Sequence, residues 1–128
     1  MAVFGKNMTF LIVDDQTTIR SLIKGCLRQL DYSKFFEADS VSVALDVLAK
    51  NNIDFVILDW AMPKTPGIEL LKAIRASKRW KDIPVLMVTA EANQDKIMEA
   101  IKAKVSGYII KPIKTEVLAE KIRTALGM

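Results

Sequence analysis

Polar residues able to hold a metal ion or accept a chemical group stand directly after short apolar runs of this 128-residue sequence. They are Asp14, Asp15, Asp59, Thr89 and Lys111. Three carboxylates that meet in one place repel each other unless they are protonated or neutralised by a cation. Oxygen-only ligands are typical of Mg²⁺, which one or two carboxylates hold while water and phosphate oxygens fill the other positions. A lysine there adds a second positive charge, so these residue types indicate a site that receives a phosphoryl group.

An aspartate carboxylate can itself act as the nucleophile, because its attack on phosphorus gives an acyl phosphate. Asp59 stands alone after its apolar run, whereas Asp14 and Asp15 are adjacent and suited to holding a metal directly or through water. Taken singly, each residue has an ordinary explanation: the aspartates and Thr89 as turn or helix-capping residues, and Lys111 as a surface charge. Their joint occurrence after four separate runs favours the chemical interpretation.

The apolar runs that precede these residues, together with one further run, predict five β-strands. Their expected ranges are Thr9–Val13, Phe35–Ala38, Phe55–Leu58, Val85–Val88 and Tyr108–Ile110. Segments with helical spacing lie between them, so strands and helices alternate along the chain. Unbroken apolar strands are typical of a parallel sheet with helices on both faces, and the carboxyl ends of such strands meet at one edge. The sequence therefore predicts an α/β fold in which the polar residues converge on one cleft.

Five helices follow from the apolar spacing, and we assign their apolar stripes to core packing. The clearest extends from Thr17 to Leu30. Its stripe consists of Ile19, Leu22, Ile23, Cys26, Leu27 and Leu30. The other helices are marked by Val41, Leu45 and Leu48; by Ile68, Leu71 and Ile74; by Ile97, Ile101 and Val105; and by Leu118, Ile122, Ala125 and Leu126. No repeat or linker interrupts the alternation, so we expect a single domain over residues 1–128.

Composition excludes several functional classes. The sequence has no histidine, which removes Ser-His and Cys-His catalysis, His-ligated metals and a phosphohistidine donor role. The one cysteine, Cys26, cannot form an internal disulfide and is expected to be a buried core residue. The formal net charge is +4, but basic and acidic residues are interleaved, so nucleic-acid binding is not expected. Neither a leader at Met1–Asn7 nor a membrane-spanning run is present, so we expect a soluble cytoplasmic protein.

The ordered set of motifs resembles the receiver domains of bacterial response regulators, in particular the single-domain chemotaxis proteins of the CheY type. The matching segments are FLIVDD at Phe10–Asp15, ILDWAMP at Ile57–Pro63, GIELLKAIRA at Gly67–Ala76, PVLMVTAEA at Pro84–Ala92 and SGYIIKP at Ser106–Pro112. The resemblance covers essentially the whole chain. It implies a doubly wound, five-stranded parallel sheet of strand order 2-1-3-4-5 with five helices. It also implies a phosphoacceptor signalling protein, with Mg²⁺-dependent self-phosphorylation and autodephosphorylation, rather than an enzyme.

The same resemblance assigns a role to each site residue. Asp59 becomes the phosphoacceptor and Asp14 and Asp15 the acidic Mg²⁺ pocket. In that pocket Asp15 would coordinate directly and Asp14 mainly through water. The backbone carbonyl of Ala61 would complete the protein ligands, and Lys111 would contact the phosphoryl group.

Thr89 and Tyr108 correspond to the family's switch residues. Thr89 would hydrogen-bond to the phosphoryl group after transfer and move inward, which leaves space beside its strand for the Tyr108 ring. The surface of the fourth helix, fifth strand and fifth helix would then change as two pre-existing states shift in population. The alternative for Tyr108 is an ordinary half-buried strand aromatic. The Lys111-Pro112 bond resembles the family's cis peptide, and the alternative is a trans proline that ends the strand.

Some positions depart from the family's pattern. Ala61 stands where chemotaxis relatives commonly carry a polar side chain, which bears on the hydrolysis rate and on any phosphatase that reads this position. Pro66-Gly67 replaces a frequent Asp-Gly, and Ser40–Ser42 lacks an acidic-glycine turn. Lys104 lies in a stretch where relatives often have glycine. Three lysines add charge near the expected output face: Lys102, Lys104 and Lys114.

The resemblance also implies partners. The phosphoryl donor would be the phosphohistidine of a CheA-like sensor histidine kinase and the target a flagellar motor switch protein, and we expect a monomer. One alternative stays open, a receiver that relays phosphate or acts as a sink outside motility. A binding module that works unphosphorylated is disfavoured by the intact set of acidic residues, threonine and lysine. A haloacid-dehalogenase-type phosphohydrolase is disfavoured because Asp14-Asp15-Gln16 is not an Asp-x-Asp motif. A flavodoxin-like electron carrier is disfavoured because two acids would repel a flavin phosphate.

Overall fold

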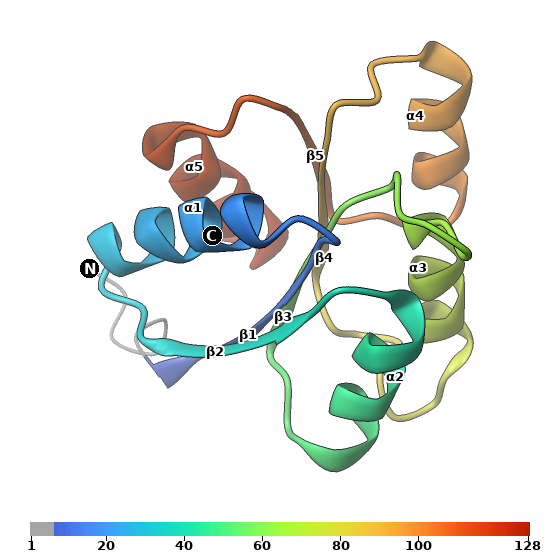
Figure 1. The fold of residues 1–128 in the computed structure, drawn as a ribbon, viewed down its shortest axis with the longest axis horizontal. Helices are drawn as coiled ribbons and strands as arrows, with labels where there is room; N and C mark the ends of the chain where they lie inside the picture. Colours follow the sequence, from blue (N-terminus) through green and yellow to red (C-terminus); the bar gives the residue numbers. More distant parts are fainter. Residues whose placement is uncertain (1–6) are drawn as a thin grey trace.

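Five short strands, four of them rich in large apolar residues and one edge strand mixed, form one parallel sheet in the computed structural model, which describes residues 7–128 (Figure 1). The strands are β1 (Thr9–Val13), β2 (Lys34–Ala38), β3 (Phe55–Leu58), β4 (Val85–Thr89) and β5 (Gly107–Ile110). Their order is β2-β1-β3-β4-β5, so the predicted doubly wound sheet is confirmed and each strand end agrees to within one residue. The prediction that Met1–Asn7 contains no leader concerns residues that, except for Asn7, lie outside the described part of the chain.

Five helices cover the two faces of this sheet. They are α1 (Thr17–Gln29), α2 (Val41–Lys50), α3 (Gly67–Ala76), α4 (Gln94–Lys102) and α5 (Thr115–Ala125). In Figure 1, α1 and α5 lie on one face, and α2, α3 and α4 lie on the other. Between residues 7 and 128, no helix has both the length and the apolar character needed to cross a membrane.

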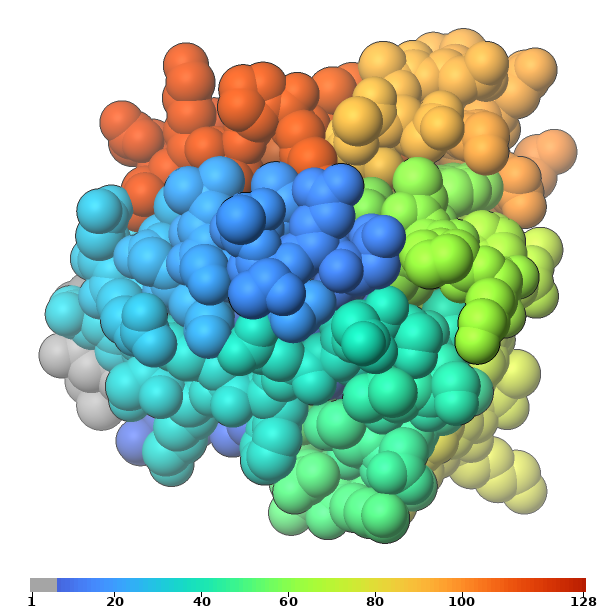
Figure 2. Space-filling view, in the orientation of Figure 1, coloured from blue at the N-terminus to red at the C-terminus, as the bar shows by residue number. Residues whose placement is uncertain are grey.

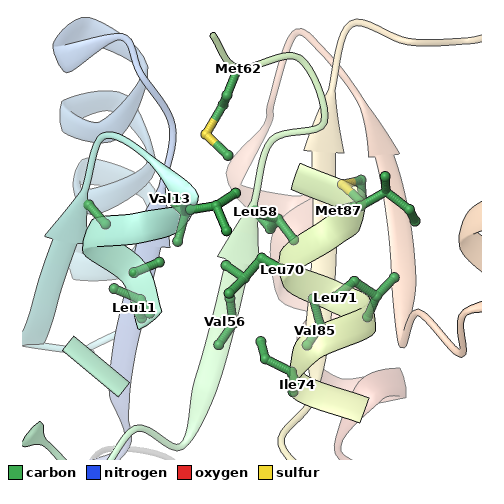
Figure 3. Close-up of a cluster of buried hydrophobic side chains, with 14 of the residues drawn as sticks. Leu11, Val13, Val56, Leu58, Met62, Leu70, Leu71, Ile74, Val85 and Met87 are labelled. Carbon is green, nitrogen blue, oxygen red and sulfur yellow. The ribbon is translucent and has the colours of Figure 1, made fainter. Parts of the chain in front are cut away.

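The sheet separates two cores, because successive side chains of a strand point to opposite faces. The strand residues of the core beneath α2, α3 and α4 are Leu11, Val13, Val56, Leu58, Val85 and Met87. Those of the core beneath α1 and α5 are Phe10, Ile12, Phe55, Ile57, Leu86, Val88 and Ile109. Figure 3 shows the first core, where Leu70, Leu71 and Ile74 of α3 lie against the central strands. Cys26 is buried in the second core, as predicted.

The fourth helix is shorter than predicted. α4 ends at Lys102, so Val105 lies outside it. Lys104 has a positive φ of 67°, and the N–H groups of Lys104 and Val105 donate to the carbonyls of Ile101 and Ala100. These bonds form a Schellman motif, whose left-handed position is usually glycine. Because the sequence has a lysine at that position, it carries no glycine stop signal for this helix.

Two residues that we assigned to core-facing stripes are exposed, so that part of the helix prediction is wrong. Leu22 of α1 is 47% exposed and Ile101 of α4 is 54% exposed. In each helix the adjacent residue, Ile23 or Ala100, is buried instead. Adjacent helical residues are about 100° apart around the axis, so a helix lying on a sheet buries one of them and leaves the other at the edge of the stripe.

Glu37 on the edge strand β2 forms ion pairs with two cations of α1. The Arg20 Nε lies 2.9 Å and the Lys24 Nζ 2.7 Å from its carboxylate oxygens. The hydrogen bond from Lys24, followed by that from Arg20, lowers the pKa of Glu37 below its ordinary value of 4.5, against the opposing effect of burial. A carboxylate with a lowered pKa contributes stability above its unfolded pKa and loses it as the pH falls through the folded pKa.

We therefore expect Glu37→Gln to lower the free energy of unfolding at pH 7 by about 0.5–1 kcal/mol, since the site is partly solvated. The difference from wild type should shrink as the pH falls through the lowered pKa of Glu37, because the wild-type carboxylate is then protonated as well. Urea unfolding monitored by circular dichroism at several pH values measures this. A difference that stays constant from pH 7 to pH 3 would contradict the assignment.

Candidate functional site

Three aspartates meet at the carboxyl edge of the sheet. Asp14 follows β1 and Asp59 follows β3, two adjacent parallel strands in which Val13 pairs with Leu58. One carboxylate oxygen from each of Asp14, Asp15 and Asp59 lies within 4.8 Å of the others. Asp14 and Asp59 are buried, whereas Asp15 is exposed. In Figure 2 the start of α1 (blue) and the loop after β3 (light green) lie side by side at the surface.

Lys111, which follows β5, reaches across the sheet edge to this cluster. Its Nζ donates to the Oδ2 of Asp14 at 3.1 Å and lies 3.5 Å from the Oδ2 of Asp59. The Lys111-Pro112 peptide bond is cis, as the resemblance implied. One ammonium group faces three carboxylates, so ionisation of all three leaves the site with an excess of negative charge.

The Oδ1 atom of Asp59 is buried and has no hydrogen-bond partner among the described residues. Both oxygens of Asp14 are engaged, one by the Gln16 N–H at 2.9 Å and one by Lys111. A buried carboxylate oxygen without a partner is costly, and an oxygen-binding cation would satisfy it while offsetting the repulsion within the cluster. The oxygen donors of Asp14, Asp15 and Asp59 therefore form an acidic cluster whose chemistry fits a hard divalent cation such as Mg²⁺.

Thr89 and Tyr108 lie beside the cluster on neighbouring strands. Thr89 ends β4 and is fully buried, and its Oγ1 accepts a hydrogen bond from the Glu91 N–H at 3.3 Å. The Tyr108 hydroxyl on β5 donates to the Glu91 carbonyl at 2.8 Å. Burial, then the charges of Glu91 and Asp59, raises the pKa of Tyr108, so its hydroxyl remains a donor at neutral pH. The backbone of Glu91 thus connects the two side chains.

The sequence profile that describes the response regulator receiver domain matches residues 10–123 of this chain. The chain belongs to the response regulator receiver domain family. It is 51% identical to the chemotaxis protein CheY of Pseudomonas aeruginosa over 115 residues, which cover 90% of this chain and 93% of the relative. It is 49% identical to CheY-3 of Vibrio cholerae over 121 residues, which cover 94% of this chain and 93% of the relative.

Solved receiver structures agree with this membership. The chemotaxis protein CheY4 of Vibrio cholerae superposes with a TM-score of 0.84 at 30% identity, covering 92% of this chain and 98% of that one. A CheY-like receiver domain protein from Methanospirillum hungatei superposes with a TM-score of 0.84 at 27% identity, and the match covers 94% of each chain. The receiver is therefore of the CheY type, consistent with a chemotaxis response regulator. A protein of this type carries a signal between a kinase and a downstream target.

Two residues that support the receiver's acidic cluster were missed by the sequence analysis. Arg20 donates from Nη1 to the backbone carbonyl of Asp14 while its Nε binds Glu37. A lone arginine in a helix gives no signal of this role, because most such side chains are solvated. Gly67 donates its N–H to the Trp60 carbonyl, and a Cβ at Gly67 would lie 1.9 Å from the backbone oxygen of Asp59. Only glycine permits this approach of α3 to the loop that carries Asp59.

The departures from the receiver pattern have local consequences. The Oγ of Ser40 accepts a hydrogen bond from the Val43 N–H at 3.2 Å, so Ser40 caps α2 without an acidic-glycine turn. Ala61 is exposed on the loop after Asp59 and brings no polar side chain to it. Next to it, Trp60 is buried with the Lys96 Nζ 5.0 Å from its ring centroid, a cation–π contact between α4 and this loop.

Proposed function

We propose that this receiver takes a phosphoryl group onto Asp59 from the phosphohistidine of a CheA-like sensor histidine kinase, in the presence of Mg²⁺. The observation that carries the proposal is the buried Oδ1 of Asp59, which has no hydrogen-bond partner in residues 7–128 and lies beside Asp14, Asp15 and Lys111. A reactive carboxylate needs an oxygen free of hydrogen bonds, and this one lies next to an ammonium group. We further propose that the protein is a cytoplasmic monomer with a single domain.

The phosphoryl transfer is a single displacement at phosphorus, in which one bond forms as another breaks. An oxygen of Asp59 attacks phosphorus while the phosphorus–nitrogen bond of the donor breaks, and its electron pair stays on the histidine nitrogen. Lys111, which lies 3.5 Å from Asp59 Oδ2, offsets charge on the phosphoryl oxygens. Asp14, Asp15, Asp59 and the Ala61 carbonyl would hold Mg²⁺, which supplies further positive charge to those oxygens. Attack of water on the acyl phosphate later returns the carboxylate and releases phosphate.

Phosphorylation would then be reported through Thr89 and Tyr108. A phosphoryl oxygen on Asp59 is a strong acceptor, and the Thr89 hydroxyl is a buried donor at the same edge of the sheet. A move of that hydroxyl toward the phosphoryl group loosens its bond with the Glu91 N–H, and Glu91 in turn holds Tyr108. Tyr108 is therefore the residue that converts a change at Asp59 into a change at the surface.

The proposed output face is an apolar hollow of about 550 Å³ formed by α4, β5 and α5. Its lining includes Ile97, Tyr108, Ile110, Pro112, Lys114 and Val117. Exposed apolar side chains next to the ammonium group of Lys114 fit a partner helix that has both apolar and acidic residues. By the likeness to chemotaxis proteins, we propose a flagellar motor switch protein as that partner.

Incubation with acetyl phosphate followed by intact mass tests the proposal. We expect a mass gain of one phosphoryl group with Mg²⁺ present and little gain in EDTA. Asp15→Asn should weaken Mg²⁺ binding by about tenfold or more in isothermal titration calorimetry, because a directly coordinating oxygen loses its charge. A metal-independent mass gain would overturn the role given to Mg²⁺, and no gain in any condition would overturn the phosphoacceptor proposal.

A further inference from the structure

A hollow of about 540 Å³ lies at the end of the sheet opposite to Asp59, between the C-terminal ends of α3 and α4 and the start of β4. We call it the basic hollow. Its charged lining residues are Lys72, Arg75, Lys81, Asp82, Lys102 and Lys104. Five cations therefore surround one carboxylate, in a protein whose net charge is only +4. Lys102 and Lys104, which we expected near the output face together with Lys114, line this hollow instead, and the hollow shares no lining residue with the output face.

Arg75 forms the fixed part of the basic hollow. Its guanidinium donates to the carbonyls of Lys104 at 2.9 Å, Lys81 at 3.0 Å and Ile83 at 2.6 Å, and to the Ser106 Oγ at 3.2 Å. These bonds tie the loop before β4 to the loop before β5. They also leave the guanidinium charge without a carboxylate within ion-pair distance among the described residues, and burial lowers the pKa of Arg75. The charge is fixed in place and partly desolvated, and the charge of Asp82 only opposes the effect of burial on the pKa of Arg75, so a further nearby anion is favoured.

The lysines of the basic hollow supply mobile charges around this centre. Lys72 lies between Glu69 at 3.7 Å and Glu99 at 3.6 Å. In residues 7–128, Lys81, Lys102 and Lys104 have no carboxylate oxygen within 4.0 Å. Three ammonium groups beside a fixed guanidinium repel each other, so the bare hollow is less stable than one occupied by negative charge.

The backbone at Lys104 adds an independent observation. Its φ of 67° places a lysine at the left-handed position of the Schellman motif that ends α4. Glycine adopts that conformation without steric cost, whereas other residues are strained there. A lysine that costs stability at this position, and that lines a hollow with other cations, indicates a use for the side chain outside folding.

The donor chemistry distinguishes between two kinds of anion. A bound phosphate is best held by a free guanidinium fork, but four hydrogen bonds to the protein already occupy Arg75. The free donors are flexible ammonium groups around an open hollow, which suit carboxylates spread along a chain. We propose that the basic hollow binds an acidic segment, rich in glutamate and aspartate, of a partner protein. This contact is separate from the phosphoryl chemistry and from the output face.

Nuclear magnetic resonance with the unphosphorylated, ¹⁵N-labelled protein tests the proposal independently of Asp59. The probe is a synthetic peptide of alternating glutamate and serine, and its glutamine counterpart is the control peptide. We expect backbone amide shifts concentrated at Lys81, Lys102 and Lys104, with affinity that falls as salt rises from low to physiological concentration. Shifts scattered over the surface, or equal binding of the glutamine peptide, would overturn the proposal.

Variants of the hollow sharpen the test. Replacement of all three free lysines with glutamine (K81Q/K102Q/K104Q) should weaken peptide binding by about tenfold. A matched control, K34Q/K64Q/K121Q, removes the same charge elsewhere and should change the affinity less than about twofold. Equal losses in the two triple variants would mean that only net charge attracts the peptide, which would overturn the site.

Two single variants separate binding from folding. Lys104→Gly should raise the melting temperature, because it relieves the left-handed strain, while it weakens peptide binding. Asp82→Asn should tighten binding, because it removes the one carboxylate of the hollow. Unchanged affinity in both variants would overturn the proposal. Tighter binding of pyrophosphate than of the peptide at the same amides would replace it with a small-anion site.

Discussion

Asp59→Asn is expected to lose phosphoryl uptake from acetyl phosphate, with a rate lowered by at least about 10³-fold. The asparagine amide has the shape of the carboxylate but offers no nucleophilic oxygen to phosphorus. Intact mass over time, at saturating Mg²⁺, measures the loss. The control is Asp54→Asn, a change at an exposed aspartate outside the cluster, which should leave uptake unchanged. Uptake by Asp59→Asn at a rate near wild type would contradict the assignment of Asp59.

The same variant should be more stable than wild type when Mg²⁺ is absent. Asp59 is buried, one of its oxygens has no hydrogen-bond partner within the part of the chain that the structure describes, and it lies near the carboxylates of Asp14 and Asp15. Removal of one negative charge relieves that repulsion, and we expect a gain of about 1 kcal/mol in the free energy of unfolding. Saturating Mg²⁺ should stabilise wild type more than the variant, because it binds the native cluster of three charges more tightly. A variant that is both inactive and unfolded would instead indicate a structural role.

Gly67→Ala is expected to produce the largest loss of stability, about 3 kcal/mol. A Cβ at Gly67 would lie 1.9 Å from the carbonyl oxygen and 2.9 Å from the carbonyl carbon of Asp59. Both are backbone atoms, so the clash cannot be relieved by a side-chain rotation, and the loop that carries Asp59 must move. Mg²⁺ affinity and phosphoryl uptake should fall together with stability. Urea unfolding and the acetyl phosphate assay measure the two effects.

Gly25→Ala is the matched control for this change. Gly25 lies inside α1, and a Cβ there would meet no heavy atom within 4 Å. Alanine has the higher helix propensity, so this variant should be more stable by about 0.5–1 kcal/mol with unchanged phosphoryl uptake. Equal effects of the two substitutions would show that the contact between Gly67 and Asp59 does not constrain the site.

Much of the fold was predictable because the chain alternates between two periodicities. The strands β1, β3 and β4 are unbroken apolar runs, and both faces of each are buried as the runs imply. Once the sheet is parallel, residues that follow different strands must meet at one edge. That is why the sequence predicts one cluster of Asp14, Asp59 and Lys111, which are far apart along the chain.

What the sequence did not reveal depends on contacts between distant segments. The stop of α4 at Lys102 relies on a lysine in the left-handed conformation, a position that sequence patterns associate with glycine. The role of Gly67 arises only when α3 approaches the backbone of Asp59. In the sequence, Arg75 is an ordinary basic residue of an amphipathic helix. Its role follows only from the four hydrogen bonds that it donates to two loops in the structure. No local pattern encodes these relationships.

The two ends of the sheet therefore carry opposite charge. Three carboxylates lie close together at the carboxyl ends of the strands, where their negative charge favours a bound cation. The amino ends of β4 and β5 lie beside the basic hollow. One β-strand of five residues, β4, connects Thr89 with that hollow. A strand of this length spans about 15 Å, which is long enough for the two sites to bind their ligands without direct contact.

The most direct test of the central claim is to locate the phosphoryl group after incubation with acetyl phosphate and Mg²⁺. Borohydride reduces an aspartyl phosphate to an alcohol, which survives digestion and can be assigned to one residue by tandem mass spectrometry. We predict reduction at Asp59 alone, and none when EDTA replaces Mg²⁺. Reduction at Asp14 or Asp15, or an unmodified Asp59 in a protein that has gained phosphoryl mass, would contradict the account.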